Sequence, residues 1–334
     1  MLVQLDDIVE RLKKGKKFLI IGHIKPDGDD ISSVASLTLI LRKMGKIAEG
    51  CIADHIPWFY QDLEGVSEIK GLEELKGYDY DTSVTVDASE ISRIGDGASL
   101  LKDGKPDITL DHHRTNVGFG KLDFYDSNYA ATAVIVYEIA QKLGIEYDSK
   151  LAGINLLGIA TDTGFFKYSN TDAKVFRYAA NLVEKGANIQ KISSAVLEHQ
   201  TLKELKLFSE MLNTLTVDMD GKLAWAYVSY GMLDRNNCTD DETGGFVGEV
   251  RSIYGVEVAI LFIEWPKNQV NISFRSKDYI DVSELAVYFG GGGHIRASGC
   301  SIKEVDLKET IDKVIKKARE FIIENSHDQF KSTS

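Results

Sequence analysis

The chain has 334 residues, of which 43% are apolar and 27% are charged. This length and composition suit about two globular domains of roughly 150 residues each. A formal net charge of −12 argues against a protein that binds long nucleic acids through their phosphates, because such proteins carry basic surfaces. No apolar run reaches the roughly 18 residues of a membrane span. The three cysteines form no CxxC pair, which indicates free thiols in a reducing cytoplasm.

Strands and helices alternate in the N-terminal half of the chain. Apolar periodicity predicts helices over residues 2–13, 31–44, 130–143, 151–160 and 173–184. Short runs of β-type residues predict strands over residues 18–22, 46–53, 82–86 and 107–110. This alternation favours a parallel sheet with helices on both faces.

The C-terminal half has a different pattern. A charged helical stretch over residues 193–215 is a candidate connector, and strands are predicted over 223–229, 256–264 and 270–276. A helix-like segment covers 240–253, a glycine run covers 290–293, and a last helix covers 307–323. We therefore predict an α/β protein with a doubly wound parallel-sheet domain, a smaller α+β domain and an active site in the cleft between them. The predicted boundaries are 1–190, a helical linker 191–211, 212–325, and a disordered polar tail 326–334.

Acidic and histidine side chains follow several of the predicted strands and helices. In open α/β sheets, ligands bind beyond the carboxyl ends of the strands, so these side chains are expected at one edge of the sheet. Gly28 separates two of the aspartates and lets a tight loop aim both of them inward. The residues are His23, Asp27, Asp29, Asp87, Asp111, His112 and Asp162.

The charge of this group points to metals. Asp27, Asp29, Asp87 and Asp162 would repel one another strongly if they were buried together without cations. Two divalent ions balance their charge, and a mixture of carboxylate and imidazole suits Mn²⁺, with Mg²⁺ as the alternative. A single aspartate at a strand end is ordinarily a turn former or a helix cap, but the whole set in this order favours a two-metal centre and hence phosphoester chemistry.

Five motifs carry a resemblance to a known family. They are GHIKPDGDD, VDASEISRIGD, DHHRTN, ATDTGFFKYSNT and GGGGHIRASG, and together they span residues 22–299. The first four resemble the motifs of the DHH phosphoesterase family, and the fifth is similar to the first type of DHH-associated domain. One departure is Asp30-Ile31-Ser32, where Asp30 is expected to cap a helix and Ser32 stands in place of a glycine usual in the family.

The resemblance implies a role for each matching residue. One metal would bind His23, Asp27 and Asp87, and the other would bind Asp29, Asp87, His112 and Asp162, with Asp87 shared. Asp111 would orient the ring of His112, and His113 would face the substrate phosphate. The catalytic residues implied are therefore His113, Asp87 and Asp111.

The glycine run is expected to form a loop whose bare N–H groups approach a phosphate or a base. Neighbouring cations could bind phosphate oxygens, and arginine does so bidentately. Arg114 and Asn116 lie beside the DHH triplet, and each either touches a phosphate or a ribose or lies in solvent. The predicted substrate-binding residues are Arg114, Asn116, Arg275, Gly292, Gly293, His294 and Arg296.

Two groups of aromatic residues have open roles. Residues 58–60 form an aromatic run after Pro57, and Phe165 and Phe166 lie beside Asp162. Each group could stack on a base or simply pack in a loop.

The resemblance implies a hydrolase that cleaves short linear dinucleotides such as pApA to 5′-mononucleotides, with cyclic di-AMP as a further substrate. The alternatives are a 3′-phosphatase acting on pAp, a non-catalytic nucleotide sensor, and a pyrophosphatase, against which the GGGH motif argues. The expected partners are two Mn²⁺ ions and short nucleotides, including short oligoribonucleotides, with no duplex nucleic acid and no membrane. A cytoplasmic homodimer is expected on general grounds.

Overall fold

In the computed structural model, residues 1–239, 241–266 and 268–329 are described, and the predicted tail lies mostly outside them. The chain divides into two compact units, Met1–His199 and a second that begins at Gln200. Among the described residues, no helix is both long and apolar enough to cross a bilayer.

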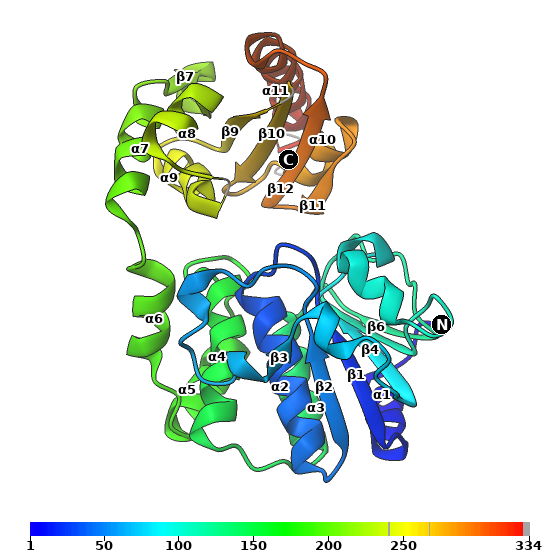
Figure 1. Ribbon diagram of the computed structural model, residues 1–334. Helices are drawn as coiled ribbons and strands as arrows, with labels where there is room; N and C mark the ends of the chain where they lie inside the picture. The colour runs from blue at the N-terminus through cyan, green and yellow to red at the C-terminus, as the bar shows by residue number, and fades with distance from the viewer. Residues whose placement is uncertain (240, 267, 330–334) are drawn as a thin grey trace. The chain divides into compact units, whose positions relative to one another are not determined.

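The first unit is built on six parallel strands in the order β3-β2-β1-β4-β5-β6 (Figure 1). This confirms the predicted parallel α/β architecture. The order reverses between β1 and β4, which is the point at which open parallel sheets bind ligands. The elements are α1 (Leu5–Lys14), β1 (Lys17–Ile21), α2 (Gly28–Lys43), β2 (Ile47–Cys51), η1 (Trp58–Tyr60), η2 (Val66–Glu68), β3 (Ile69–Lys70), η3 (Leu72–Leu75), β4 (Thr82–Val86), η4 (Ile91–Leu100), β5 (Ile108–Asp111), β6 (Leu122–Tyr125), α3 (Thr132–Lys142), α4 (Ser149–Asp162), α5 (Ala173–Glu184) and α6 (Ile189–Leu197).

The two faces of this sheet are covered differently. Helices α1 to α5 share one large apolar core with one face of the strands. On the other face, Leu19 and Ile21 of β1 pack against Leu75 of η3 and Ile94 of η4. Short 3₁₀ segments therefore occupy the face where the sequence predicted α-helices.

Aspartates fix the starts of three helices that matter for the site. Asp27 accepts hydrogen bonds from the N–H groups of Asp29 and Asp30 at the start of α2. Asp148 and Asp172 do the same for α4 and α5. The expectation that Asp30 caps α2 is therefore wrong, because Asp27 already occupies the N-cap position and satisfies the free N–H groups there.

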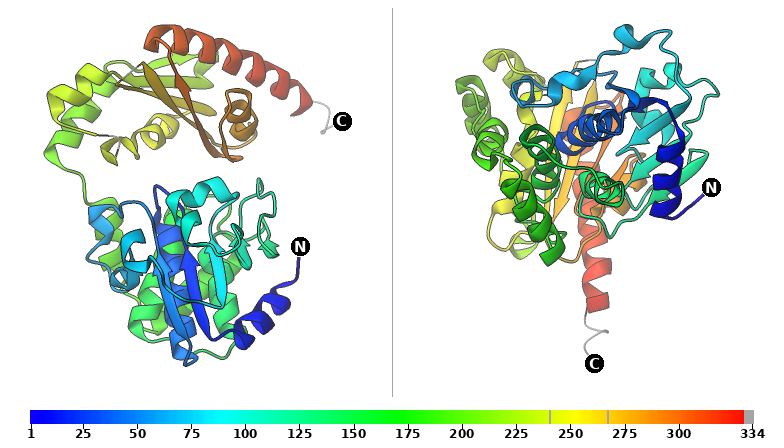
Figure 2. Two further views of the ribbon diagram at one scale, coloured as in Figure 1. Left: turned by 45° about the vertical axis from the view of Figure 1, so that its right-hand side comes forward. Right: turned by 90° about the horizontal axis from the view of Figure 1, so that it is seen from below.

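The second unit contains a mixed six-stranded sheet in the order β11-β12-β10-β9-β8-β7, in which only the β8–β9 pair is parallel. One face packs against α7, α8 and α9, and the other packs against α10 and α11. Figure 2 shows α11 running past the edge of this sheet. The elements are α7 (Leu202–Leu212), β7 (Thr216–Asp218), η5 (Met219–Gly221), β8 (Leu223–Val228), α8 (Tyr230–Asn236), η6 (Asp241–Thr243), α9 (Phe246–Ser252), β9 (Val258–Trp265), β10 (Gln269–Ser276), α10 (Val282–Tyr288), β11 (Gly292–His294), β12 (Ala297–Lys303) and α11 (Leu307–Gln329).

Two segments differ from the expectation. The predicted helical connector consists of two helices, α6 and α7, and the two units divide between them. Ile192 of α6 belongs to the first core, whereas Leu207 and Met211 of α7 belong to the second. The domain boundaries at 190 and 212 stay a prediction.

The glycine run is only partly a loop. Gly292 and Gly293 form the edge strand β11, paired with β12. A Cβ on Gly291 would lie 2.1 Å from the carbonyl oxygen of Gly299. Glycine thus serves here for the close approach of two backbones, and a strand results because one neighbour supplies the hydrogen-bonding partners.

Helices α2, α3 and α4 pack closely behind the sheet edge that carries the acidic residues. A Cβ on Gly158 of α4 would lie 2.7 Å from Cβ of Ala133 and from Oγ of Ser32, and 2.8 Å from Oδ1 of Asp29. Ser32 is fully buried, and its hydroxyl faces the carbonyl of Asn155 on α4. The serine that departs from the family pattern thus lies in a helix–helix interface.

We expect Gly158→Ala to lower the free energy of unfolding by up to about 2 kcal/mol, because overpacking at this contact, which costs about 1–3 kcal/mol, outweighs the roughly 1 kcal/mol by which alanine is the better helix former. Gly153→Ala, in the same helix, is the matched control because nothing lies within 4 Å of its added Cβ. Urea unfolding measures both. Equal stability of the two variants would contradict the packing argument.

Candidate metal centre

The side chains predicted to bind metal meet at the sheet edge beyond β1, β4 and β5. His23 follows β1, Asp87 follows β4, and Asp111 ends β5 with His112 next in sequence. These three strands are adjacent in the sheet. The backbone of Asp87 has a left-handed φ of 54°, a conformation that is strained for a non-glycine residue and is concentrated at functional sites.

Asp87 lies at the middle of the group. Its Oδ2 is 3.6 Å from Nε2 of His23, and its Oδ1 is 3.6 Å from Nε2 of His112. The two oxygens of one carboxylate therefore face two different histidines. This is the position that a carboxylate shared by two metals would occupy.

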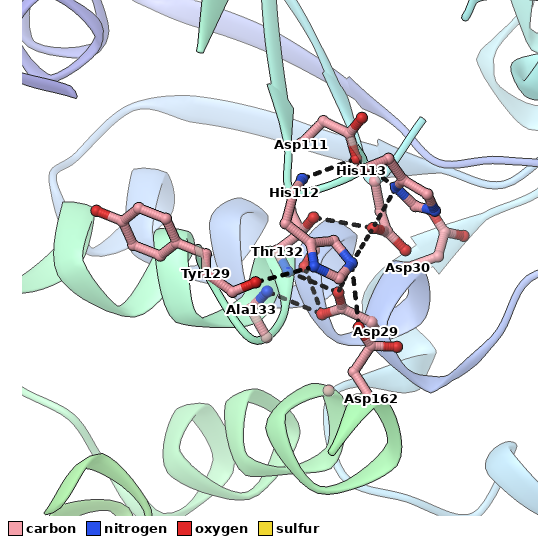
Figure 3. Close-up of polar contacts among 12 residues, drawn as sticks. Asp29, Asp30, Asp111, His112, His113, Tyr129, Thr132, Ala133 and Asp162 are labelled. Atoms are coloured by element: carbon pink, nitrogen blue, oxygen red, sulfur yellow. Dashed lines mark hydrogen bonds and ion pairs between the residues drawn. The ribbon is translucent and has the colours of Figure 1, made fainter. Parts of the chain in front are cut away.

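Two overlapping groups could each hold one cation. His23, Asp27 and Asp87 offer ligand atoms within 4.8 Å of one another, and so do Asp29, Asp87 and His112. Nε2 of His112 is also 3.0 Å from Oδ2 of Asp162, at the end of α4 (Figure 3). The family resemblance implied the same two groups, and their role as metal ligands stays a prediction.

Asp29 is held by the start of a second helix. Its two oxygens accept hydrogen bonds from the N–H groups of Thr132 at 2.6 Å and Ala133 at 2.8 Å, the first residues of α3 (Figure 3). The hydroxyl of Thr132 donates to Oδ1 of Asp87 at 2.9 Å. The N-terminus of α3 favours negative charge, so it orients both carboxylates and stabilises their ionised form.

The buried aspartates repel one another, and this repulsion shifts their pKa values in a direction that a bound cation would reverse. Burial, together with Asp87 and Asp162, raises the pKa of Asp29 well above its ordinary value. Burial and neighbouring acids also raise the pKa of Asp162. Burial alone would raise the pKa of Asp87, but His23, His113 and His112 lower it.

The histidines respond in the opposite direction. Burial would lower the pKa of His23, but Asp30, Asp87 and Asp27 raise it to about 10. Burial would also lower the pKa of His112, but Asp162 and Asp87 raise it well above the usual value. Buried carboxylates that face imidazoles in this way fit a pair of cations, whose charge would take the place of the protons on the imidazoles.

Backbone carbonyls orient the two ligand imidazoles. Nδ1 of His112 lies 3.2 Å from the carbonyl oxygen of Tyr129, and Nδ1 of His23 lies 2.8 Å from that of Ile24. Nδ1–H can donate to each carbonyl, which turns Nε2 of each ring toward the carboxylate of Asp87. Arg93 Nη2 is 3.3 Å from Nδ1 of His23, but a carbonyl is the better partner for a protonated nitrogen.

Asp111 acts on a different ring from the one expected. Its Oδ1 accepts from Nδ1 of His113 at 2.6 Å and from the backbone N–H of His112 at 2.9 Å. Its Oδ2 accepts from Nδ2 of Asn116 at 2.6 Å. The expectation that Asp111 orients the ring of His112 is therefore wrong; it orients the ring of His113, because the Tyr129 carbonyl already holds that of His112.

Asn116 also differs from its expected role. Its side chain is buried, donates to the carbonyl of Ala88 as well as to Asp111, and accepts from the N–H of Gly118. These bonds use the amide for structure, so Asn116 positions Asp111 and does not face solvent. Arg114, by contrast, is exposed.

The other predicted substrate residues lie together in the second unit. Arg275 is the last residue but one of a central strand, β10, and pairs with Ala297 of β12, next to the turn that leads from β11. Gly292, Gly293 and His294 form β11. The guanidinium of Arg296 donates to the carbonyls of Ile280 and Asp278, so part of its donor capacity holds the backbone of its own unit.

Sequence reasoning missed Thr132 and Tyr129. Thr132 lies in the first turn of the helix predicted over 130–143, and a threonine near a helix start reads as an ordinary capping residue. Tyr129 acts through its backbone carbonyl, which leaves no trace in the side-chain pattern. Asp30 was noticed, but its contact was not: its Oδ1 accepts from the N–H of His23, and burial raises its pKa to about 7.

Comparison with known proteins adds a second line of observation. Residues 17–159 match the family described as "DHH family, N-terminal domain", and residues 220–324 match the "DHHA1 domain". A "Bifunctional oligoribonuclease and PAP phosphatase NrnA" from Thermus thermophilus is 32% identical over 301 residues, 90% of this chain and 89% of that protein. The protein of the same name from Bacillus subtilis is 26% identical over 86% of this chain and 90% of its own length.

A solved structure agrees on the fold. The "exopolyphosphatase-related protein" from Bacteroides fragilis has a TM-score of 0.87 and 23% identity, and the match covers 95% of this chain and 96% of that one. The family motifs, the geometry of their acidic and histidine residues and the whole-length relatives agree. The chain belongs to the DHH family of metal-dependent phosphoesterases.

Proposed function

We propose that this enzyme hydrolyses short linear nucleotides such as pApA to 5′-mononucleotides, and short oligoribonucleotides in the same way. The observation that carries the proposal is the placement of Asp87, whose two oxygens face two ligand groups. Such a pair of sites is suited to displacement at phosphorus. The names of the relatives from Thermus thermophilus and Bacillus subtilis support short RNA as the substrate class.

The proposed ligands of one cation are His23, Asp27 and Asp87, and those of the other are Asp29, Asp87, His112 and Asp162. When bound, such a pair would lower the pKa of an attacking water and offset negative charge on the phosphate. We propose Mn²⁺ for both sites, because each includes an imidazole, with Mg²⁺ as the alternative.

The chain's own residues would do the rest. Thr132 and the start of α3 hold Asp29 and Asp87 in place. Asp111 binds Nδ1 of His113 and so orients its ring, and we propose that Nε2 of that ring contacts a phosphate oxygen. Asp87 and Asp111 thus contribute by position and charge, and His113 by direct contact with substrate.

The second unit is proposed to bind the substrate's terminal phosphate or nucleotide through Arg275, Gly292, Gly293, His294 and Arg296, with Arg114 contributing from the first unit. Arginine suits this role because its fork can bind phosphate bidentately. The active-site cleft between the two units stays a prediction.

A second activity has specific support. The two relatives are named as phosphatases of PAP as well as oligoribonucleases, so we also propose hydrolysis of the 3′-phosphate of pAp. Cyclic di-AMP stays a further candidate substrate. A non-catalytic sensor is the remaining alternative, and the full set of candidate ligands argues against it.

A cytoplasmic location and a homodimer are part of the proposal. The three cysteines are unpaired, which suits a reducing compartment. Closed two-fold dimers are the commonest assembly of soluble proteins. Sedimentation at micromolar concentration would measure the assembly, and a single monomer species would contradict the dimer.

A substrate panel tests the proposed function. Protein stripped with EDTA is expected to be inactive on pApA and pAp, and added Mn²⁺ is expected to restore turnover of both more fully than Mg²⁺. Pyrophosphate and cyclic di-AMP complete the panel, with mononucleotide release measured by chromatography. Tight binding of pApA without turnover under any metal would favour the sensor instead.

Asp87→Asn should remove activity on every substrate. Loss of one charge from a ligand shared by both sites costs several kcal/mol of transition-state stabilisation, which corresponds to a fall of about 1,000-fold or more in kcat/KM. Asp62→Asn, an exposed aspartate of the same unit, is the control and should keep full activity. An active Asp87→Asn variant would mean that the carboxylate is not a shared ligand.

Arg275→Ala should act mainly on binding. Removing one charge-assisted hydrogen bond costs about 1.5–3 kcal/mol, so KM for pApA should rise by roughly 10- to 100-fold with kcat little changed. Arg235→Ala, on the exposed surface of the same unit, should leave KM unaltered. A fall in kcat alone would place Arg275 outside substrate binding.

A further inference from the structure

The first unit contains a pocket beside the candidate metal centre. Its volume is about 270 Å³, close to the lower end of the roughly 300–1,000 Å³ of small-molecule sites. It shares Asp27 and Asp162 with that centre. The lining residues are Asp27, Gly28, Tyr60, Thr161, Asp162, Gly164, Phe165, Lys167, Tyr168, Val196 and Leu197.

One wall of this pocket is an unusual turn. Gly164, Phe165 and Phe166 all have left-handed φ angles, of 57°, 54° and 66°. Two phenylalanines in this conformation cost about 1–3 kcal/mol each and persist only where the surrounding structure enforces them. The turn brings the Tyr168 ring back onto Gly164, where an added Cβ would lie 2.5 Å from the ring. This strained turn places the side chains of Phe165 and Tyr168 in the pocket lining, directly after Asp162 in sequence.

The chemistry of the lining suits a nucleoside. Tyr60, Phe165 and Tyr168 offer aromatic faces, on which bases of any sequence can stack. Lys167 is the one basic residue among the described lining residues, and its ammonium can donate to a base edge or a ribose hydroxyl. The carboxylates of Asp27 and Asp162 disfavour a second phosphate in the same space.

The pocket and the carboxylates are close in space. Asp27 and Asp162 line the pocket and are also candidate metal ligands, and Oδ2 of Asp162 lies 3.0 Å from Nε2 of His112. An occupant of the pocket therefore lies next to any phosphorus held at the metal centre.

The two proposed substrates differ in what the attacked phosphorus carries. In pApA, water cleaves the bond between phosphorus and O3′ of the first nucleotide. The hydroxyl group goes to phosphorus and the proton to O3′, and two 5′-mononucleotides result. In pAp the same kind of bond breaks, but the phosphorus carries no second nucleoside. A site for that nucleoside is therefore needed for pApA and idle for pAp.

We propose that this pocket binds the nucleoside attached to the attacked phosphate, stacking its base against Tyr168 and Phe165. The inference rests on the proposed function and specifies how one active site serves both substrates. The pocket is then a specificity site for a second nucleoside, carried wholly by the first unit.

Substitutions at the pocket test this assignment. Leu197 is 56% exposed at the end of α6, so Leu197→Trp can fill the pocket with little effect on the core. Tyr168→Leu removes one aromatic face, whereas Tyr168→Phe retains it. Because Leu197→Trp blocks the stacking of a base and Tyr168→Leu removes one aromatic face, we expect both variants to raise KM for pApA by roughly 5- to 150-fold. KM for pAp should rise much less than KM for pApA in Leu197→Trp and Tyr168→Leu, and Tyr168→Phe should lose less on pApA than Tyr168→Leu because it retains the ring.

Leu202→Trp is the matched control, because Leu202 is 70% exposed at the start of α7 and does not line the pocket. It should leave both substrates unaffected. Parallel losses on pApA and pAp would place the pocket at the leaving nucleotide or in general folding, and no loss on either would leave it without a role. Each of these results overturns the assignment.

Calorimetric titration separates this proposal from the proposed function. If the wild-type protein turns over neither substrate, the function fails, but binding of pApA and pAp can still be compared. Wild-type protein should bind pApA more tightly than pAp, and Leu197→Trp should remove the difference. Equal binding of the two nucleotides by wild-type protein would reject the pocket on its own.

Discussion

The structure depends on how four aspartates can be kept together at one sheet edge. The carboxylate of Asp87 lies between His23 and His112 with an oxygen 3.6 Å from each imidazole. Asp29 is fully buried and would be costly as an isolated anion, yet two N–H groups at the start of α3 bind it. Helix dipole, imidazole and cation each offset part of the same repulsion, so the site is most complete when all three are present.

This constraint explains features of the fold that have no catalytic contact. Gly158 exists so that α4 can approach Asp29 and Ser32. The left-handed backbone of Asp87 turns its carboxylate toward both histidines directly after β4. Packing and electrostatics are therefore coupled. A methyl group added to Gly158 of α4 would press on Oδ1 of Asp29, which is a candidate metal ligand.

The sequence predicted elements whose patterns were local and strong. The bounds of β4 and α5 were predicted to the residue, because apolar runs and flanking signals agreed. Strand β6 was missed because buried Asp123 interrupts it. That carboxylate is satisfied by contacts distant in sequence, from the amine of Met1 and the hydroxyl of Thr109.

Contacts between residues distant in sequence also limited what could be predicted at the candidate metal centre. The sequence could identify the candidate metal ligands, which the structure brings together, because their residue types follow strands in a recognisable order. Partners that act through a backbone carbonyl, such as Tyr129, or through a long-range hydroxyl, such as Thr132, could not. Asn116 was misassigned because a polar residue after a strand reads as a loop contact, whereas its amide is buried against Asp111.

Helix α4 connects the candidate metal centre to the proposed nucleoside pocket. Its last residue is the candidate ligand Asp162, and the turn that follows supplies Phe165, Lys167 and Tyr168 to the neighbouring pocket. Because the helix is fixed against α2 by close packing, the turn can be strained without displacing the ligand. A pocket built in this way can change its lining while the metal centre stays intact, so substrate range and catalytic power can vary independently in this fold.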